Sequence, residues 1–108
     1  MKRKLFVTTS LPYANGQLHL GHILENIQAD IWVRYQKSTG NECVFISGDD
    51  AHGSAIMLSA QKNNVSAEEW VDKIREDHYA DLKGFNIDYD VFHTTRSSEN
   101  KKIVYEIY

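Results

Sequence analysis

Two short apolar runs separated by a long helical pattern constrain the fold of this chain most. The runs span Lys4 to Thr9 and Cys43 to Ser47. Continuous apolar runs are typical of strands buried on both faces, as in a parallel sheet. Between the runs, apolar residues recur at spacings of three and four, at Leu20, Ile23, Leu24, Ile27, Ile31 and Tyr35. That stripe predicts an amphipathic helix of about 20 residues that begins near Leu18 and stops at Gly40. Strand, helix and strand in this order predict a βαβ crossover unit with parallel strands.

The second half of the chain continues the alternation of helices and strands. Ser66 and Glu69 have the spacing of a capping box, which opens a helix. Ile87, Tyr89 and Val91 alternate with aspartates, a pattern that predicts a third strand. The elements expected here are helices over about 54–63, 66–83 and 97–108 and a strand over 87–91. The fold class is therefore α/β, and the absence of a stop signal before Tyr108 suggests a piece of a longer protein.

Composition excludes several classes of protein. The chain has 108 residues, enough for one domain, with 42% hydrophobic and 25% charged residues, as in globular proteins. No apolar run approaches the ~18 residues of a membrane span, so we expect no membrane partner. A formal net charge of −3 argues against a general nucleic-acid binder. The single cysteine, Cys43, is interpreted as a small buried hydrophobe in a reducing, cytoplasmic protein.

Two polar loops, residues 10–22 and 48–53, follow the first two predicted strands. Ligands bind at the carboxyl ends of the strands in open α/β sheets, so these loops are the candidate site. His19 and His22 share a face of the first helical turn, with Gly21 between them. The free amides of a helix N-terminus favour phosphate, and the imidazoles can donate hydrogen bonds to it. Two alternatives remain at this point: a pair of ordinary polar histidines, and a metal site built from His19, His22, Asp49, Asp50 and His52.

The first loop carries a family resemblance. Residues 12–22, Pro-Tyr-Ala-Asn-Gly-Gln-Leu-His-Leu-Gly-His, resemble the first signature of class I aminoacyl-tRNA synthetases, P-Y-x-N-G-x-x-H-x-G-H. The stretches 48–53, Gly-Asp-Asp-Ala-His-Gly, and 28–36 are similar to the methionyl-tRNA synthetases of that family. The resemblance runs over essentially the whole chain. It implies that residues 1–108 are the N-terminal half of a Rossmann-like nucleotide-binding catalytic domain, ending before the connective insertion.

The resemblance also implies an activity and a set of site residues. Such an enzyme joins methionine to ATP as methionyl-adenylate, releases pyrophosphate, and transfers the methionyl group to tRNA(Met). His19 and His22 would stabilise the ATP phosphates, and Asp50 would pair with the substrate ammonium. The further ATP-binding residues would be Pro12, Asn15, Gly16 and Gly21, and the further methionine-binding residues Ser10, Leu11 and Tyr13.

Other implied partners lie mostly outside these residues. Magnesium would accompany ATP as part of the substrate, and no residue of this chain is expected to bind a metal. The family's K-M-S-K-S loop, its cysteine-rich zinc insertion and its anticodon-binding domain are absent from the chain. Contacts with tRNA are therefore expected elsewhere, and the chain alone is expected not to charge tRNA. An uncovered half sheet is also expected to favour self-association.

Two other functions remain open. The first is a nucleotidyltransferase that shares the H-x-G-H turn, and the second is a non-catalytic nucleotide-binding fragment. Among the other polar residues, His52 is expected to shape the site and His93 to be an ordinary histidine at a strand end. Trp32, Trp70 and Tyr79 are expected to be packed in the core or half-buried.

Overall fold

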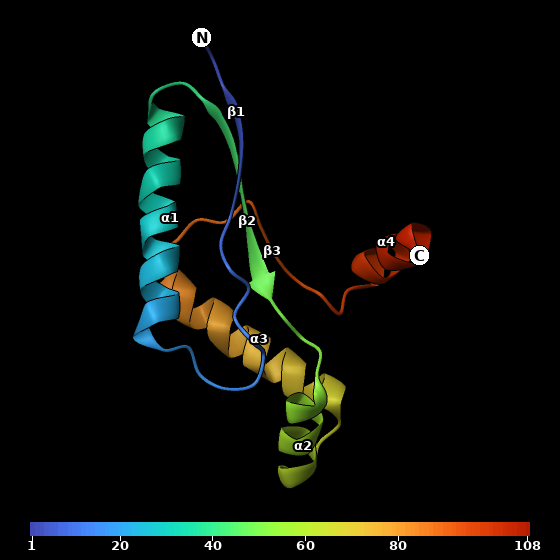
Figure 1. The fold of residues 1–108 in the computed structure, drawn as a ribbon. Helices are drawn as coiled ribbons and strands as arrows, with labels where there is room; N and C mark the ends of the chain where they lie inside the picture. The colour runs from blue at the N-terminus through green and yellow to red at the C-terminus, as the bar shows by residue number, and fades with distance from the viewer.

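The computed structural model describes all 108 residues, which form a three-stranded parallel sheet and four helices (Figure 1). The strand order is β1-β2-β3, and both neighbouring pairs are parallel. The elements in chain order are β1 (Lys4–Thr8), α1 (Leu20–Ser38), β2 (Glu42–Asp49), α2 (Ser54–Lys62), α3 (Ala67–Gly84), β3 (Val91–Thr94) and α4 (Ser98–Ile107). The predicted α/β class and the βαβ unit are thus confirmed. None of the helices combines the length and apolar composition that a membrane crossing requires.

The sheet register brings the two polar loops to one edge. Lys4 pairs with Glu42 and Thr8 with Ile46, so β1 and β2 run side by side to their carboxyl ends. In Figure 1 both ends point to the lower edge of the sheet, where α3 passes beneath them. The loops that follow β1 and β2 therefore meet above α3.

The core consists of two apolar clusters. One lies between the sheet and α1, and it includes Phe45, Leu82 and Ile87, none more than 1% exposed. Cys43 belongs to this cluster and is buried, as the sequence predicts. The other cluster packs the two loops onto α2 and α3, through Ala14, Ala51, Ile56, Val71 and Ile74. This second cluster forms the floor of the candidate site.

The prediction of which face α1 buries was only partly right, because Ile27 of the apolar stripe packs against the sheet–helix cluster but most of the stripe is exposed. Leu20, Leu24, Ile31 and Tyr35 of the apolar stripe are between 56% and 83% exposed. The helix instead buries Val33 with three polar residues, Asn26, Asp30 and Gln36. Burial of these polar groups is tolerated because they are hydrogen-bonded. Asp30, for example, accepts from Arg34 Nε at 2.7 Å and from the Asp88 amide at 3.1 Å.

The third strand lies later than the alternation of residues 87–91 predicts. Ile87 is buried and Tyr89 half-buried in the core, but their segment is not in the sheet. The Asp88 amide donates to a side chain of α1, and the Phe45 amide of β2 donates to the Asp90 carboxylate at 2.7 Å. Regular pairing with β2 starts only at Val91, opposite Ile46. The alternation therefore reflects burial of side chains and not strand pairing.

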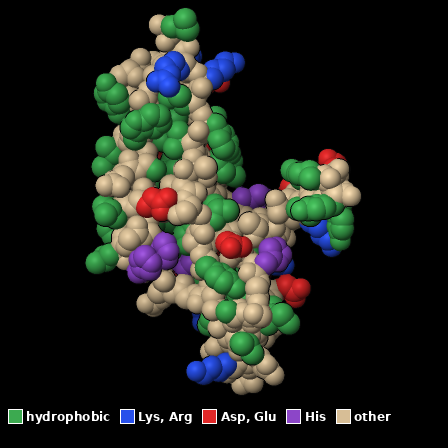
Figure 2. All heavy atoms as spheres, in the orientation of Figure 1, with side chains coloured by type: hydrophobic (Ala, Val, Ile, Leu, Met, Phe, Trp, Pro, Cys, Tyr) green, Lys and Arg blue, Asp and Glu red, His purple; other side chains and the backbone are tan.

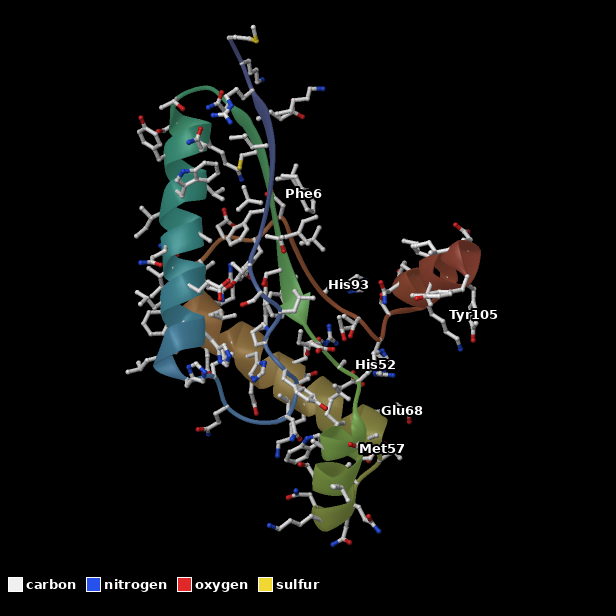
Figure 3. All side chains as sticks on the ribbon, viewed as in Figure 1. Phe6, His52, Met57, Glu68, His93 and Tyr105 are labelled. Atoms are coloured by element: carbon white, nitrogen blue, oxygen red, sulfur yellow. The ribbon has the colours of Figure 1, made fainter.

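The sheet face opposite α1 is largely uncovered. Phe6 is 70% exposed, Val44 40% and Val91 43%. In Figure 3 Phe6 points away from α1, and α4 stands apart from the sheet on this side. The expected uncovered apolar face is present, whereas self-association through it remains a prediction.

Candidate active site

Backbone hydrogen bonds join the two polar loops. The Asp50 amide donates to the Pro12 carbonyl at 2.9 Å, and the Ala14 amide donates to the Asp50 carbonyl at 2.9 Å. Tyr13 and Asp50 therefore form a parallel β-bridge beyond the ends of β1 and β2. The Tyr13 side chain is 38% exposed, and Asp50 is exposed beside it. Two residues predicted to contact methionine are thus neighbours, from loops about forty residues apart in the chain.

The two histidines of the first loop cap α1. His19 is the N-cap residue, and its Nδ1 accepts a hydrogen bond from the Gly21 amide at 3.0 Å. The His22 Nδ1 accepts in turn from the His19 amide at 3.4 Å. The two rings are stacked, with centroids 3.7 Å apart and an interplanar angle of 25°. The prediction that they share one face is confirmed, and Figure 2 shows histidine side chains gathered at this end of α1.

The capping hydrogen bonds determine the tautomer of both rings. An Nδ1 that accepts a hydrogen bond carries no proton, so the proton of each neutral ring is on Nε2. Burial lowers the pKa of His22, and neighbouring His19 and His78 lower it further, while Glu25 opposes the shift. His22 is therefore neutral near pH 7. Neither Nε2 has a partner within the chain, so the pair presents two N–H donors to a ligand.

The backbone amides at the start of α1 are less available than the sequence suggests. The His22 and Ile23 amides donate to the His19 carbonyl, and the Gly21 amide donates to the His19 ring. The imidazoles are therefore the main donors for phosphate. The structure also explains why position 21 is a glycine. A Cβ at this position would lie 2.8 Å from Cε1 of His19. The glycine lets the capping ring fold over the helix.

Helix α3 holds the turn that precedes the histidines. The Trp70 indole Nε1 donates to Oδ1 of Asn15 at 3.1 Å, and Nε2 of His78 lies 2.5 Å from the Gly16 carbonyl. Trp70 also packs against the loop core cluster, as the sequence predicts, but its hydrogen bond was not foreseen. His78 was not singled out at all. The available signal was its place among Val71, Ile74 and Leu82 on the buried face of α3, where a polar residue is unusual.

The start of the first loop is held by α1. The amide and the hydroxyl of Ser10 donate to the Glu25 carboxylate at 2.8 and 2.6 Å. These two bonds lower the pKa of Glu25. Sequence reasoning missed Glu25, because its partner lies fifteen residues earlier in the chain. Leu11 follows with 41% exposure, so the structure leaves an apolar side chain available at this position.

The two aspartates that end β2 differ in environment. Asp50 is exposed, whereas Asp49 is fully buried and neither of its carboxylate oxygens has a hydrogen-bond partner. Burial raises the pKa of Asp49, and the side chains of Thr94, Arg75 and His78 oppose that shift. No three His, Cys, Asp or Glu side chains lie close enough together to share a metal ion. The residues of the metal alternative are therefore not gathered into one site.

A large cavity lies beside the predicted site and not within it. It has a volume of about 870 Å³ and lies between α2, α3, α4 and the loop of residues 51–54. His52 lines it, but none of the residues predicted to bind ATP or methionine does. Gly53 lines this cavity and also lies against Tyr13 of the predicted methionine site. A Cβ at Gly53 would collide with the Tyr13 hydroxyl. His93 lies outside the cavity, 3.4 Å from the Glu99 carboxylate (Figure 3).

Known proteins similar to this chain match it along nearly its whole length. Residues 5–108 match the family model of tRNA synthetases class I (M). Two curated relatives, methionine–tRNA ligases of Neisseria meningitidis serogroup C (strain 053442) and serogroup A (strain Z2491), are each 52% identical to this chain over all 108 residues. The chain spans only 16% of the length of these relatives.

Two solved structures are similar as well. A Mycobacterium tuberculosis methionyl-tRNA synthetase in complex with methionyl-adenylate is 25% identical, with a TM-score of 0.85 over 92% of this chain and 19% of that one. A second structure of a methionyl-tRNA synthetase from that organism, also bound by methionyl-adenylate, is 25% identical with a TM-score of 0.84. It covers 90% of this chain and 19% of the other.

Proposed function

This chain belongs to the tRNA synthetases class I (M) family, and from that premise we propose that it forms the ATP- and methionine-binding part of an enzyme that activates methionine. One observation carries the proposal. His19 and His22 cap α1 through their Nδ1 atoms and direct two free Nε2–H donors outward at the carboxyl edge of a parallel sheet. That is the edge where ligands of α/β folds bind.

In the proposed first step, a carboxylate oxygen of methionine attacks the α-phosphorus of ATP. The new P–O bond gives methionyl-adenylate, and the bond to the β-phosphate breaks, so that its electron pair leaves with pyrophosphate. The substrate carries its own nucleophile, and no protein nucleophile is needed. Catalysis then depends on positioning and on stabilisation of the charge that grows on the phosphate oxygens. Donors fixed by a helix cap, as in His19 and His22, need no reorganisation for this task.

The methionine end of the proposed site is the bridge between Tyr13 and Asp50. The exposed Asp50 carboxylate there would pair with the substrate ammonium and so orient the substrate. The thioether of methionine has no charge, and the partly exposed Leu11 and Tyr13 side chains offer it an apolar and aromatic surface. Ser10, fixed by Glu25, would form the border of this pocket.

The ATP end of the proposed site is the turn that leads into α1. Asn15 and Gly16 are held by α3, and Pro12 is bonded to Asp50, so the turn has a defined path. Pro12, Asn15, Gly16 and Gly21 are proposed to contact ATP together with the histidines. Magnesium would enter with the triphosphate, and we assign no side chain of this chain to it.

The second proposed step transfers the methionyl group to tRNA(Met) in the cytoplasm. The tRNA surface is placed outside these residues, because the chain has a net charge of −3 and tRNA binding calls for a basic surface. Residues 1–108 are proposed as the N-terminal half of a Rossmann-like catalytic domain. Similarity to methionine–tRNA ligases over every residue favours this function over a nucleotidyltransferase.

The proposal is tested by ATP–pyrophosphate exchange in the complete protein that carries these residues. We expect exchange that depends on methionine, and its loss when His19 and His22 are both replaced by asparagine. Gln28→Ala is the control, because Gln28 is exposed on the same helix and should leave the rate unchanged. Exchange that does not require methionine, or full activity of the double variant, would overturn the proposal.

A further inference from the structure

We propose that His78, assisted by Trp70, is a positioning residue for adenylate formation: from α3 it holds the Asn15–Gly16 turn, and so sets the place of the histidine pair. This inference rests on the proposed function. Neither residue would touch the substrate. Their role would be to limit the movement of the loop between the bridge at Asp50 and the N-cap of α1.

The hydrogen bonds of the loop show why the contact of His78 matters. Ala14 is fixed to Asp50, and α1 begins after His19. Between them, Gln17 and Leu18 make no hydrogen bonds, although Leu18 packs against the sheet–helix core. The bond of His78 to the Gly16 carbonyl is therefore the last polar anchor before the catalytic pair.

Helix α3 offers two such anchors from one side. Trp70 and His78 are eight residues apart, which is slightly more than two helical turns and about 12 Å along the axis. Trp70 reaches the Asn15 side chain, and His78 reaches the Gly16 backbone, across 55 and 62 residues of sequence. Helix α3 therefore holds two consecutive loop residues by long-range hydrogen bonds, in addition to its apolar packing against the loops.

The burial of His78 argues against a passive core role. It is 1% exposed and lies among the apolar residues that α3 buries. A buried imidazole without hydrogen bonds is costly. Its Nε2 donates to the Gly16 carbonyl, while its Nδ1 has no partner. The only hydrogen bond of the His78 ring is therefore made with the loop, and not with its own helix or with the sheet.

His78 also lies within electrostatic range of the catalytic pair. It contributes to the lowered pKa of His22, after burial and His19. Its Nδ1, Nε of Arg75 and both carboxylate oxygens of Asp49 are buried without hydrogen-bond partners. These three side chains come from the end of β2 and from α3, the helix that holds the Asn15–Gly16 turn. A displacement of the His78 ring would therefore act directly on the turn that leads to the histidine pair.

The test compares two replacements of His78 in the complete protein. His78→Leu removes the donor and leaves the Gly16 carbonyl unpaired, whereas His78→Gln places an amide N–H near the position of Nε2. In methionine-dependent pyrophosphate exchange, we expect His78→Leu to raise the KM for ATP and lower kcat, together by about tenfold or more. The KM for methionine should stay within about twofold, and His78→Gln should recover most of the loss.

Two further variants sharpen the comparison. Trp70→Phe keeps the aromatic packing and removes only the indole N–H, so it should raise the KM for ATP by a smaller factor. Tyr79→Phe is the control on the same helix, because Tyr79 is 42% exposed and is assigned no contact with the loop, and it should leave both KM values and kcat unchanged. Rates are expressed per active site by titration, so that a loss of folded protein does not count as an effect on the loop.

Hydrogen exchange of residues 12–22, measured by mass spectrometry, reports the loop without any activity. We expect faster exchange there in His78→Leu, unchanged exchange in β2, and protection restored in His78→Gln. Equal defects in the two His78 variants, or unchanged exchange of the loop in His78→Leu, would overturn the inference. Absence of methionine-dependent activity in the wild-type protein would instead refute the proposed function, and the exchange of the loop would still decide the role of His78.

Discussion

Two replacements of His22 separate the proposed roles of its ring nitrogens. Nδ1 accepts the capping hydrogen bond from the His19 amide, and Nε2 is the proposed donor to phosphate. His22→Asn removes the Nε2–H donor, but its side-chain oxygen can still accept the His19 amide as Nδ1 does. His22→Gln does the opposite, because its amide nitrogen lies near the position of Nε2 while no acceptor remains near Nδ1. Both variants keep a polar side chain at the third position of α1, so helix propensity changes little.

The structure allows the two effects to be ranked. The capping bond of His22 is 3.4 Å long and lies in an exposed region, so its loss is worth at most about 1 kcal/mol. Loss of a preorganised donor to a transition-state oxyanion typically costs about 10²–10³ in rate. His22→Asn should therefore slow adenylate formation by about 10²-fold or more, and His22→Gln by about tenfold or less.

The assay is single-turnover formation of methionyl-adenylate by the complete protein, with methionine affinity measured separately by calorimetry. Both variants should bind methionine as the wild type does, since His22 is assigned to phosphate. Equal rates for the wild type and His22→Asn, with weaker methionine binding, would refute the assignment. A larger defect in His22→Gln than in His22→Asn would show that the cap matters more than the donor.

Three other residues give predictions of different kinds. Asp50→Asn in the complete protein should weaken methionine binding by about 2 kcal/mol, or roughly 30-fold, and leave ATP binding unchanged; calorimetric titration with each ligand checks this, and equal losses would contradict it. Asp49→Asn should stabilise the chain at pH 7, because burial raises the pKa of Asp49 and ionisation above that pKa costs stability in the folded state. The gain should shrink near pH 3, where the wild-type carboxyl is protonated as well; urea unfolding at both pH values decides, and a less stable variant at pH 7 would disprove it. Phe6→Lys should reduce self-association of the isolated chain, since Phe6 is 70% exposed on the open sheet face. Sedimentation velocity measures this, and a monomeric wild-type chain would refute it.

Sequence patterns predicted correctly those features that depend on contacts between residues close together in the chain. The histidine pair lies at a junction of strand and helix, and its capping bonds join residues no more than three apart. The capping box of Ser66 and Glu69 is equally local and is present as predicted. The apolar runs around Leu5 and Phe45 pair in parallel because the intervening helix is long enough to return the chain.

Long-range polar contacts explain what the sequence did not reveal. Asn26 is buried because the hydroxyl of Tyr89, 63 residues away, donates to its side chain at 2.8 Å, while its own amide donates to the His22 carbonyl at 2.8 Å. Its apolar neighbour Leu24 consequently faces outward. The anchor of Gly16 by His78 has the same character. No periodicity marks such pairs, since each partner is an ordinary polar residue until the fold brings them together.

The tautomers of His19 and His22 test the central claim most directly. ¹⁵N NMR of the imidazole rings at pH 7.5, with and without a stable analogue of methionyl-adenylate, measures which nitrogen of each ring carries the proton. The account predicts a proton on Nε2 in both rings of the free protein, with the Nε2 resonances shifting when the analogue binds. Protons on Nδ1, or Nε2 resonances that do not change on binding, would contradict it.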